Sequence, residues 1–290
     1  MPEVLLRSEL LTSVGSRAAL DEALERGAWR RVLRGTYARA NETDGLELRC
    51  AAAQRLLPPL SWVADRCLLW LLGVDVLPPG PPRLEVVVPR LAVVPRRGGV
   101  LARQADVPLA DRWLLRPSGL RCLRPARAAA DLLRLLPRAE AVVVADAVQR
   151  AGLVDAQDLR TELAAHAGLR GVRRAGAALS LSDPLVESPP ESRLRLVLVD
   201  AGLRPVCQHD VVGPDGRWLA RVDLAFPVAR VAVEYHGRAV HEREDVFTRD
   251  RQRQNALVRA GWTVLRYTAA DLRQPSLIVA ELRACLERAA

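Results

Sequence analysis

The chain has 290 residues, half of them hydrophobic, a proportion that supports a packed interior and excludes wholesale disorder. Its length suggests two or three domains. No apolar run approaches the ~18 residues of a membrane span, and the N-terminus lacks the basic start and apolar core of a signal peptide. We therefore expect a cytoplasmic protein with no membrane partner. The five cysteines form no C-x-x-C pair, which indicates neither a zinc knuckle nor a disulfide framework.

Positive charge is concentrated in the first part of the chain. The formal net charge is +9, and all 43 basic residues are arginine. Residues 1–180 hold 27 Arg against 19 acids, a net of +8, whereas residues 181–290 hold 16 Arg against 15 acids, a net of +1. We expect an anionic partner, with nucleic acid as the first candidate, to be held by the first part. Because the chain contains no lysine, any catalytic role that a lysine takes in other proteins must be filled by another residue type here.

Two short helices and a hairpin are predicted over residues 1–45. Leucines at 5, 6, 10 and 11 have helical spacing, and Ser16 can cap a second helix. The segment WRRVLRGTYAR (29–39) then alternates apolar and basic residues around a turn at Arg34–Gly35, which places Arg31 on the same face as Trp29. This order describes a winged helix. The alternative is a small helical cap with exposed arginines.

A middle α/β segment is predicted over residues 46–180. Residues 46–75 and 125–180 have helical patterns, and LEVVVPR (84–90) is strand-like. The segment at 94–107 resembles a β-hairpin with Gly98–Gly99 at its bend. No catalytic constellation is evident in this segment. We expect the following side chains to be solvated, capping or incidental: Asp131, Asp146, Asp155 and His166, together with His209 further along the chain.

The C-terminal segment, residues 181–290, has the element order αβββαβ followed by a last helix. Ser, Asp and Pro residues at 181–192 interrupt the preceding helical pattern and mark a boundary. Helices are predicted at 189–201, 243–260 and 276–288, and strands at 205–212, 217–226, 230–237 and 262–268. The whole chain is therefore expected to be a multidomain α+β protein.

Two acidic residues in the predicted strands carry the strongest chemical signal. Strand alternation puts Glu234 and His236 on one face, and Asp223 lies eleven residues earlier, across a short hairpin. Ionised carboxylates are costly to bury in strands this hydrophobic without a cation or hydrogen bonds. Mg²⁺ or Mn²⁺ between Asp223 and Glu234 would offset that cost, and could activate water against a phosphodiester.

The pattern D-x(10)-E-x-H on a hairpin after a leading helix resembles the PD-(D/E)XK nuclease superfamily. The segments RVDLAFP, VAVEYHG, RDRQRQNAL and GWTVLRYT resemble the bacterial family related to the very-short-patch-repair endonuclease. The resemblance covers residues 181–290 and implies a restriction-endonuclease-like domain with a central mixed sheet and with Asp223 and Glu234 as metal ligands. His236 stands where the superfamily usually has a catalytic lysine. A histidine can orient water or carry a proton, yet the loss of lysine also fits an inactive domain.

Three further residues follow from this resemblance. His241 matches a histidine that repair-type relatives keep after this strand. Glu191 in SPPES (188–192) matches an acid that the superfamily often places near the metal. Ser188-x-x-Glu191 is also a capping box, so a capping role stays open. Arg249 can contact phosphate or lie on a solvated face, whereas Arg251 and Arg253 are expected to be solvated.

The first part resembles a different family. RAALDEALERGAWRRVLRGTYAR is similar to the winged helix that opens AbiEi-type antitoxins, and the stretch through RCLRPARAAADLL is similar to that family more loosely. This resemblance implies DNA binding, with Arg17 at the start of the recognition helix and Arg30, Arg31 and Arg34 on or beside the wing. It does not imply a toxin partner.

Two functions are expected from these features. The first is hydrolysis of DNA by a Mg²⁺-dependent endonuclease with an N-terminal DNA-binding winged helix. The alternative is an AbiEi-like DNA-binding transcriptional regulator or antitoxin whose nuclease-like domain is catalytically inactive. The acids and His236 favour the enzyme, and the absence of lysine favours the regulator. An active domain should bring the carboxylates of Asp223 and Glu234 within ~4–6 Å of each other.

Overall fold

The computed structural model describes residues 2–78, 80–94, 98–237 and 244–289, with the backbone alone for residues 244–250. Over these residues the protein is α+β with several sheets, as predicted. None of the described helices is both long and apolar enough to cross a membrane. All five cysteines are buried, as expected for small hydrophobic side chains.

The N-terminal unit contains the two helices and the hairpin that the sequence predicts. Its elements are β1 Leu5–Leu6, α1 Arg7–Val14, α2 Arg17–Glu25, β2 Trp29–Leu33 and β3 Thr36–Arg39, with the sheet order β1-β3-β2. The Ser16 hydroxyl caps α2 by accepting the Ala19 N–H at 3.1 Å. The predicted alternation along β2 is wrong, because the register shifts between Arg31 and Leu33 and leaves Arg31 exposed while Trp29 is buried.

The middle region is built on a five-stranded sheet of order β6-β5-β4-β8-β7. Its elements are α3 Leu46–Leu56, β4 Trp62–Val63, α4 Asp65–Leu71, β5 Leu84–Val88, β6 Val100–Gln104, β7 Arg112–Leu115 and β8 Leu120–Leu123. The predicted hairpin at 94–107 is wrong, because β6 runs parallel to β5 with Leu84 opposite Val100. The N–H of Leu84 donates to the Gly99 oxygen at 2.8 Å, so the chain has already returned along the sheet before β6 begins.

A layer of helices follows, as predicted for residues 125–180. It consists of α5 Pro125–Leu135, α6 Arg138–Arg150, α7 Ala156–Ala165 and α8 Val172–Leu179. Asp155 caps α7 by accepting the Asp158 N–H at 2.7 Å, as expected. The expectation that Asp131 and Asp146 are solvated is wrong. Both are buried and paired with arginines, some of which lie far away in the sequence.

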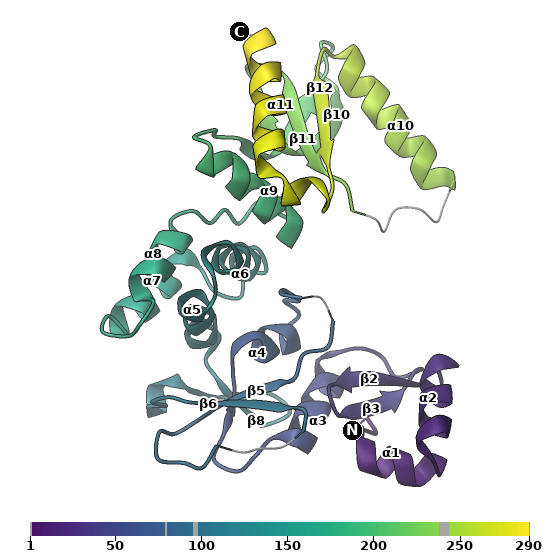
Figure 1. Cartoon of the computed structure of the whole chain (residues 1–290), viewed down its shortest axis with the longest axis vertical. Helices are drawn as coiled ribbons and strands as arrows, with labels where there is room; N and C mark the ends of the chain where they lie inside the picture. Colours follow the sequence, from purple (N-terminus) through teal and green to yellow (C-terminus); the bar gives the residue numbers. More distant parts are fainter. Residues whose placement is uncertain (1, 79, 95–97, 238–243, 290) are drawn as a thin grey trace.

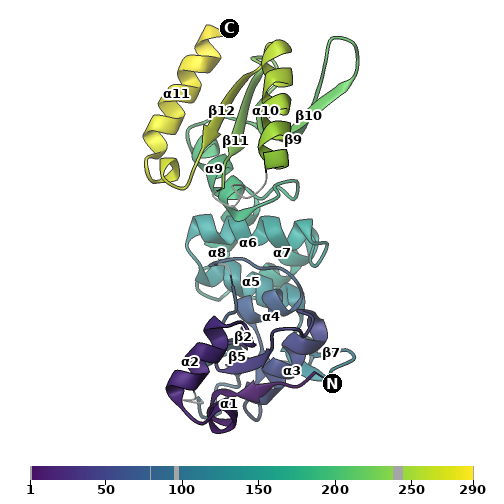
Figure 2. The same ribbon diagram turned by 90° about the vertical axis from the view of Figure 1, so that its right-hand side faces the viewer.

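The C-terminal unit has the predicted αβββαβ order and a mixed sheet of order β12-β11-β10-β9. Its elements are α9 Pro189–Asp200, β9 Val206–Val212, β10 Trp218–Phe226, β11 Val231–Tyr235, α10 Glu244–Arg259, β12 Thr263–Tyr267 and α11 Pro275–Arg288. β11 and β12 are parallel, whereas the other pairs are antiparallel. Helices α9 and α11 cover one face of the sheet and α10 covers the other (Figures 1 and 2).

These regions follow one another along the long axis, with α5–α8 between the five-stranded sheet and the C-terminal unit (Figure 1). The packed cores run across the predicted domain limits at residues 45 and 180. Val32 and Leu33 of the hairpin share a core with Leu56 of α3, and Leu196 of α9 joins the core of α5–α8. The three-domain division therefore stays a prediction, and the interfaces between the regions are hydrophobic.

Candidate functional site

Asp223 lies where the side-chain alternation of β10 reverses. Val222 packs in the cluster under α10, whereas Leu224 packs in the cluster under α9 and α11. Regular alternation along a strand would put both on one face. The reversal coincides with Gln208 on β9, which is at the level of Asp223 and has a left-handed φ of +48°. Because a left-handed residue interrupts a strand's pleat, both strands change face at this point.

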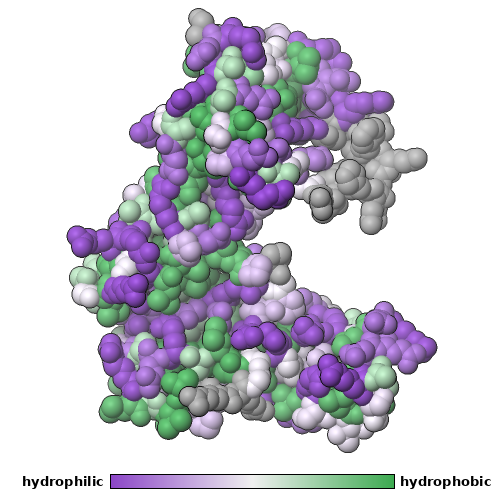
Figure 3. Space-filling view, in the orientation of Figure 1, coloured by the Kyte–Doolittle hydropathy of each residue, from purple (hydrophilic) through white to green (hydrophobic). Residues whose placement is uncertain are grey.

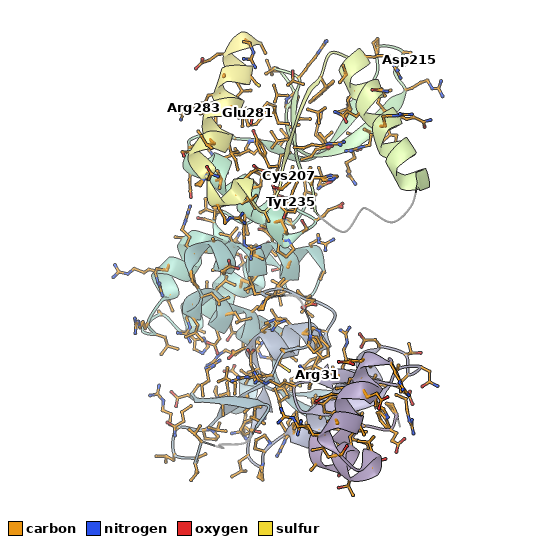
Figure 4. The ribbon with its side chains drawn as sticks, turned by 45° about the vertical axis from the view of Figure 1, so that its right-hand side comes forward. Arg31, Cys207, Asp215, Tyr235, Glu281 and Arg283 are labelled. Carbon is orange, nitrogen blue, oxygen red and sulfur yellow. The ribbon has the colours of Figure 1, made fainter. Side chains whose placement is uncertain are left out.

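Asp223 and Glu234 lie at opposite positions of two adjacent antiparallel strands. The registered pair Leu224–Val233 puts Asp223 next to Glu234 one position further along. The Oδ2 atom of Asp223 accepts the backbone N–H of Tyr235 at 2.9 Å. Figure 4 labels Tyr235 and Cys207, which mark this level of the sheet on β11 and β9. The predicted proximity of the two strands is confirmed.

Glu191 also belongs to this site. Its Oε1 atom accepts the Ser188 hydroxyl at 2.6 Å, and its Oε2 atom accepts the Gln208 amide at 3.1 Å. Ser188 accepts the Glu191 N–H in return at 3.4 Å, so the capping box is real. The same carboxylate is close enough to Asp223 to influence it. Burial, and after it the negative charge of Glu191, raises the pKa of Asp223 to about 6.

Charge compensation distinguishes these two acids from the fully buried acids, although half-buried Glu85 of the middle region also has no arginine within 4 Å among the described side chains, and burial raises its pKa to about 7. Asp223 and Glu191 lie within 4 Å of no arginine nitrogen among the side chains that the structure describes. By contrast, every fully buried acid in the described ranges has an arginine within that distance: Asp65, Asp111, Asp131, Asp146, Glu162 and Glu234. Two half-buried carboxylates whose hydrogen bonds come from neutral donors fit the ligand preferences of a hard divalent cation, although the charge of Arg253 acts on Asp223 from a distance.

Glu234 has a different environment. Its Oε2 atom accepts Nε of Arg266 at 3.1 Å, and its Oε1 atom pairs with Nη2 of Arg253. The expectation that Arg253 is solvated is therefore wrong, because α10 packs over the face to which Glu234 points. Metal ligation by Glu234 stays a prediction, and in this structure each of its oxygens is engaged by one guanidinium group.

The remaining predicted residues lie at the margin of this site or outside the described part. His236 follows the end of β11 and is half-buried, and its backbone N–H donates to the backbone carbonyl of Tyr267 at 2.7 Å. His241 and the side chain of Arg249 lie outside the described residues. Arg251 is exposed, as expected. His236 is thus the one histidine that the described chain places beside the strand bearing Glu234.

The predicted DNA-contacting arginines fall into two groups. Arg17 is exposed at the start of α2. Arg30 instead donates to the Glu42 oxygen at 2.9 Å and lies 3.9 Å from Asp44, so its charge is partly engaged within the protein. Arg31 and Arg34 are exposed and line a common cavity beside the hairpin.

One acidic cluster in the middle region was not predicted. Ligand atoms of Asp111, Glu162 and His166 lie within 4.8 Å of one another, so His166 is not incidental. The Nε2 atom of His166 is 2.8 Å from Nη1 of Arg127, which can only donate, so Nε2 accepts and Nδ1 donates to the Glu162 carbonyl. With Arg124 and Arg127 paired to the two acids, this cluster is a buried structural network. The spacing of Glu162 and His166 on one helix face was its only sequence signal.

Comparisons with known proteins give relatives without a stated activity. No family model matches the chain. The uncharacterized proteins MT2308 and Rv2248, from the CDC 1551 / Oshkosh and H37Rv strains of Mycobacterium tuberculosis, are each 33% identical over 178 residues. The match covers 61% of this chain, and the chain spans 65% of the length of these relatives.

One solved structure is a distant structural neighbour. The crystal structure of the RV2827C protein from Mycobacterium tuberculosis aligns with 19% identity and a TM-score of 0.34, over 74% of this chain and 85% of that chain. The class of protein is therefore given by the fold itself, a multidomain α+β protein.

Proposed function

We propose that this protein is a DNA endonuclease that depends on a divalent cation, with hydrolysis at Asp223 and Glu191. The observation that carries the proposal is the pair of half-buried carboxylates at the level where β9 and β10 change face. Repulsion within such a pair is relieved by a cation. A carboxylate whose pKa is raised, as that of Asp223 is, and that lies beside a second acid from another element is typical of catalytic sites.

The arrangement of elements supports the two domain types. A leading helix, three antiparallel strands, a helix and a parallel strand form the pattern that the PD-(D/E)XK resemblance implies. Two helices and a hairpin in a β1-β3-β2 sheet fit a winged helix, for which DNA is the expected ligand. Figure 3 shows the molecule hollowed between the part with the C-terminal unit and the part with the N-terminal unit.

The chain's own residues would prepare the site as follows. Asp223 and Glu191 would hold Mg²⁺ or Mn²⁺, which when bound supplies a Lewis acid and an activated water. The Tyr235 N–H fixes one oxygen of Asp223, and Ser188 with Gln208 fixes Glu191. Arg253 and Arg266, which pair with Glu234, lie on the same side of the sheet as that carboxylate. His236 would orient water or carry a proton.

One observation favours the alternative, a DNA-binding regulator with an inactive nuclease-like domain. Both oxygens of Glu234 are engaged by arginines. The chain also has no lysine that could serve as the catalytic lysine usual in the superfamily. A domain that had lost catalysis could keep Glu234 as a structural ion pair.

The deciding experiment combines metal binding with cleavage. Purified protein should show a higher melting temperature with Mg²⁺ or Mn²⁺ and should cut plasmid DNA with the same metals. Asp223→Asn and Glu191→Gln should each abolish both effects. Asp215→Asn, at an exposed turn position of the same unit, is the matched control and should behave as wild type. Metal-induced stabilisation without cleavage would favour the regulator. If the metals produce neither stabilisation nor cleavage, the proposed metal site is wrong.

A further inference from the structure

A cavity of about 840 Å³ opens beside the N-terminal hairpin. Its walls are the β2–β3 hairpin, the start of α1, and two loops of the middle region at 81–83 and 98–99. Five arginines line this basic groove, and none of the described residues that line it is acidic. They are Arg7, Arg31, Arg34, Arg66 and Arg83.

Four of these five charges are unbalanced within the described protein. Arg66 donates to the carbonyls of Val76 and Gly80 and lies 3.6 Å from Asp75, so its charge is engaged. The other four are exposed, and among the described residues none of their side chains makes an ion pair or hydrogen bond. These four are Arg7, Arg31, Arg34 and Arg83. Figure 4 shows Arg31 at the junction of the N-terminal unit and the middle region.

The walls of the groove are held together by backbone contacts. The N–H of Arg34 donates to the Pro82 oxygen at 3.2 Å, and that of Arg7 donates to the Gly35 oxygen at 3.1 Å. Gly99 has φ +87°, and a Cβ atom there would lie 2.2 Å from the Arg34 oxygen. The hairpin turn is thus packed on the middle region, so the four arginines project from one preorganised surface.

We propose that the basic groove binds the phosphate backbone of duplex DNA through Arg7, Arg31, Arg34 and Arg83. Like charges without acidic partners repel one another, and a row of phosphates relieves that repulsion while releasing counterions. Guanidinium groups match phosphate oxygens in a bidentate manner. The proposal rests on the DNA binding in the proposed function and deepens it, because it moves the main contact from Arg17 and Arg30 to a groove shared with the middle region.

The experiment measures DNA affinity of the full chain without metal, so that cleavage plays no part. A labelled 20-bp duplex is titrated at several salt concentrations against wild type and the triple variant Arg31→Gln/Arg34→Gln/Arg83→Gln. We expect the variant to lose at least tenfold in affinity at 0.1 M salt. Its log–log salt slope should fall by about one for each phosphate contact removed. The matched control is Arg160→Gln/Arg173→Gln, at exposed positions on α7 and α8, and it should bind as wild type.

Each outcome decides one point. If wild type binds and the triple variant binds equally well with an equal melting temperature, the groove is excluded while the proposed function stands. If wild type shows no salt-sensitive binding, DNA binding fails, and the groove proposal fails with it. If millimolar inorganic phosphate displaces the duplex as effectively as unlabelled duplex does, the site takes small anions and the backbone proposal is overturned. If Arg17→Gln abolishes DNA binding and the triple variant does not, the main DNA contact lies at the start of α2 and not in the basic groove.

Discussion

Asp223 and Glu234 are neighbours on adjacent strands, yet the protein treats their charges differently. Glu234 is 6% exposed and neutralised by two arginines, whereas Asp223 is held by a neutral N–H and faces Glu191. The free-energy cost of burying an ionised carboxylate is thus offset by arginines at Glu234 and is not offset by a direct ion pair at Asp223. The unbalanced acid is the better candidate for a metal ligand.

Asp223→Asn should stabilise the metal-free protein above pH 6. The pKa of Asp223 is raised from 3.8 to about 6, so between these values the folded state keeps a proton that the unfolded chain has released. This contribution to stability is full below pH 4 and is lost as the pH rises through 6. At pH 7.5 the variant should be more stable by on the order of 2 kcal/mol, after a discount for partial exposure, and the gain should vanish near pH 4. Urea denaturation across this pH range measures it; a gain that does not vary with pH would contradict the assignment.

Glu234→Gln should destabilise the C-terminal unit, because it removes the buried carboxylate that pairs with Arg253 and Arg266. Breaking a buried ion pair costs several kcal/mol, and we expect about 2 kcal/mol here because both arginines are partly exposed. Asp210→Asn is the control, since its pair with Arg221 is half exposed and should contribute under ~0.5 kcal/mol. Equal free energies of unfolding for the two variants would show that the arginines find other partners.

At the scale of elements, the reversal of β9 and β10 shapes the site. It depends on Gln208 at φ +48°, a conformation that β-branched side chains strongly disfavour. Gln208→Val should therefore be less stable than Gln208→Gly by about 1–2 kcal/mol, although Val is the better residue for a regular strand. Chemical denaturation of the two variants makes the comparison. If Val were the more stable, β9 would be regular in solution and the reversal would be absent.

The sequence predicted the elements well and their irregularities poorly. Hydrophobic period and turn residues located the C-terminal helices and strands within one or two residues. The shifts at Arg31–Leu33 and at Gln208 were not predictable, because a single inserted or left-handed residue leaves no mark in the pattern. The parallel pairing of β5 and β6 was missed for a related reason, since Gly98–Gly99 indicates a bend but not which strand pairs with which. Arginine partners such as Arg253 for Glu234 depend on tertiary packing.

At the scale of the whole molecule, α9 ties the C-terminal unit to the helical layer. Arg195 of α9 lies 3.3 Å from Asp146 of α6, with both side chains at most 8% exposed, and also donates to the Leu181 oxygen at 2.7 Å. A second pair between the same helices, Arg138–Asp200, is about half exposed. The two pairs allow a matched comparison of a buried and an exposed tie.

Asp146→Asn should cost about 1–2 kcal/mol, because it takes the carboxylate from the buried guanidinium of Arg195, while burial, which raises the pKa of Asp146, offsets part of the loss. Asp200→Asn removes the exposed pair and should cost less than ~1 kcal/mol. Hydrogen exchange followed by mass spectrometry should show faster exchange in α6 and α9 for the first variant only. Equal exchange in both variants would show that hydrophobic packing alone joins the two regions.

The contact of Gly99 with the hairpin turn has a consequence for how this protein can be rearranged. Residues 1–45 resemble a portable DNA-binding module in sequence, yet Val32 and Leu33 sit in a core completed by α3, and the turn rests on a loop more than sixty residues later. A fusion that transplanted only the helices and hairpin would bare apolar surface and leave half of the basic groove behind. The smallest transferable cassette therefore includes the five-stranded sheet, so residues 1–45 are packed as one part of a larger structural block.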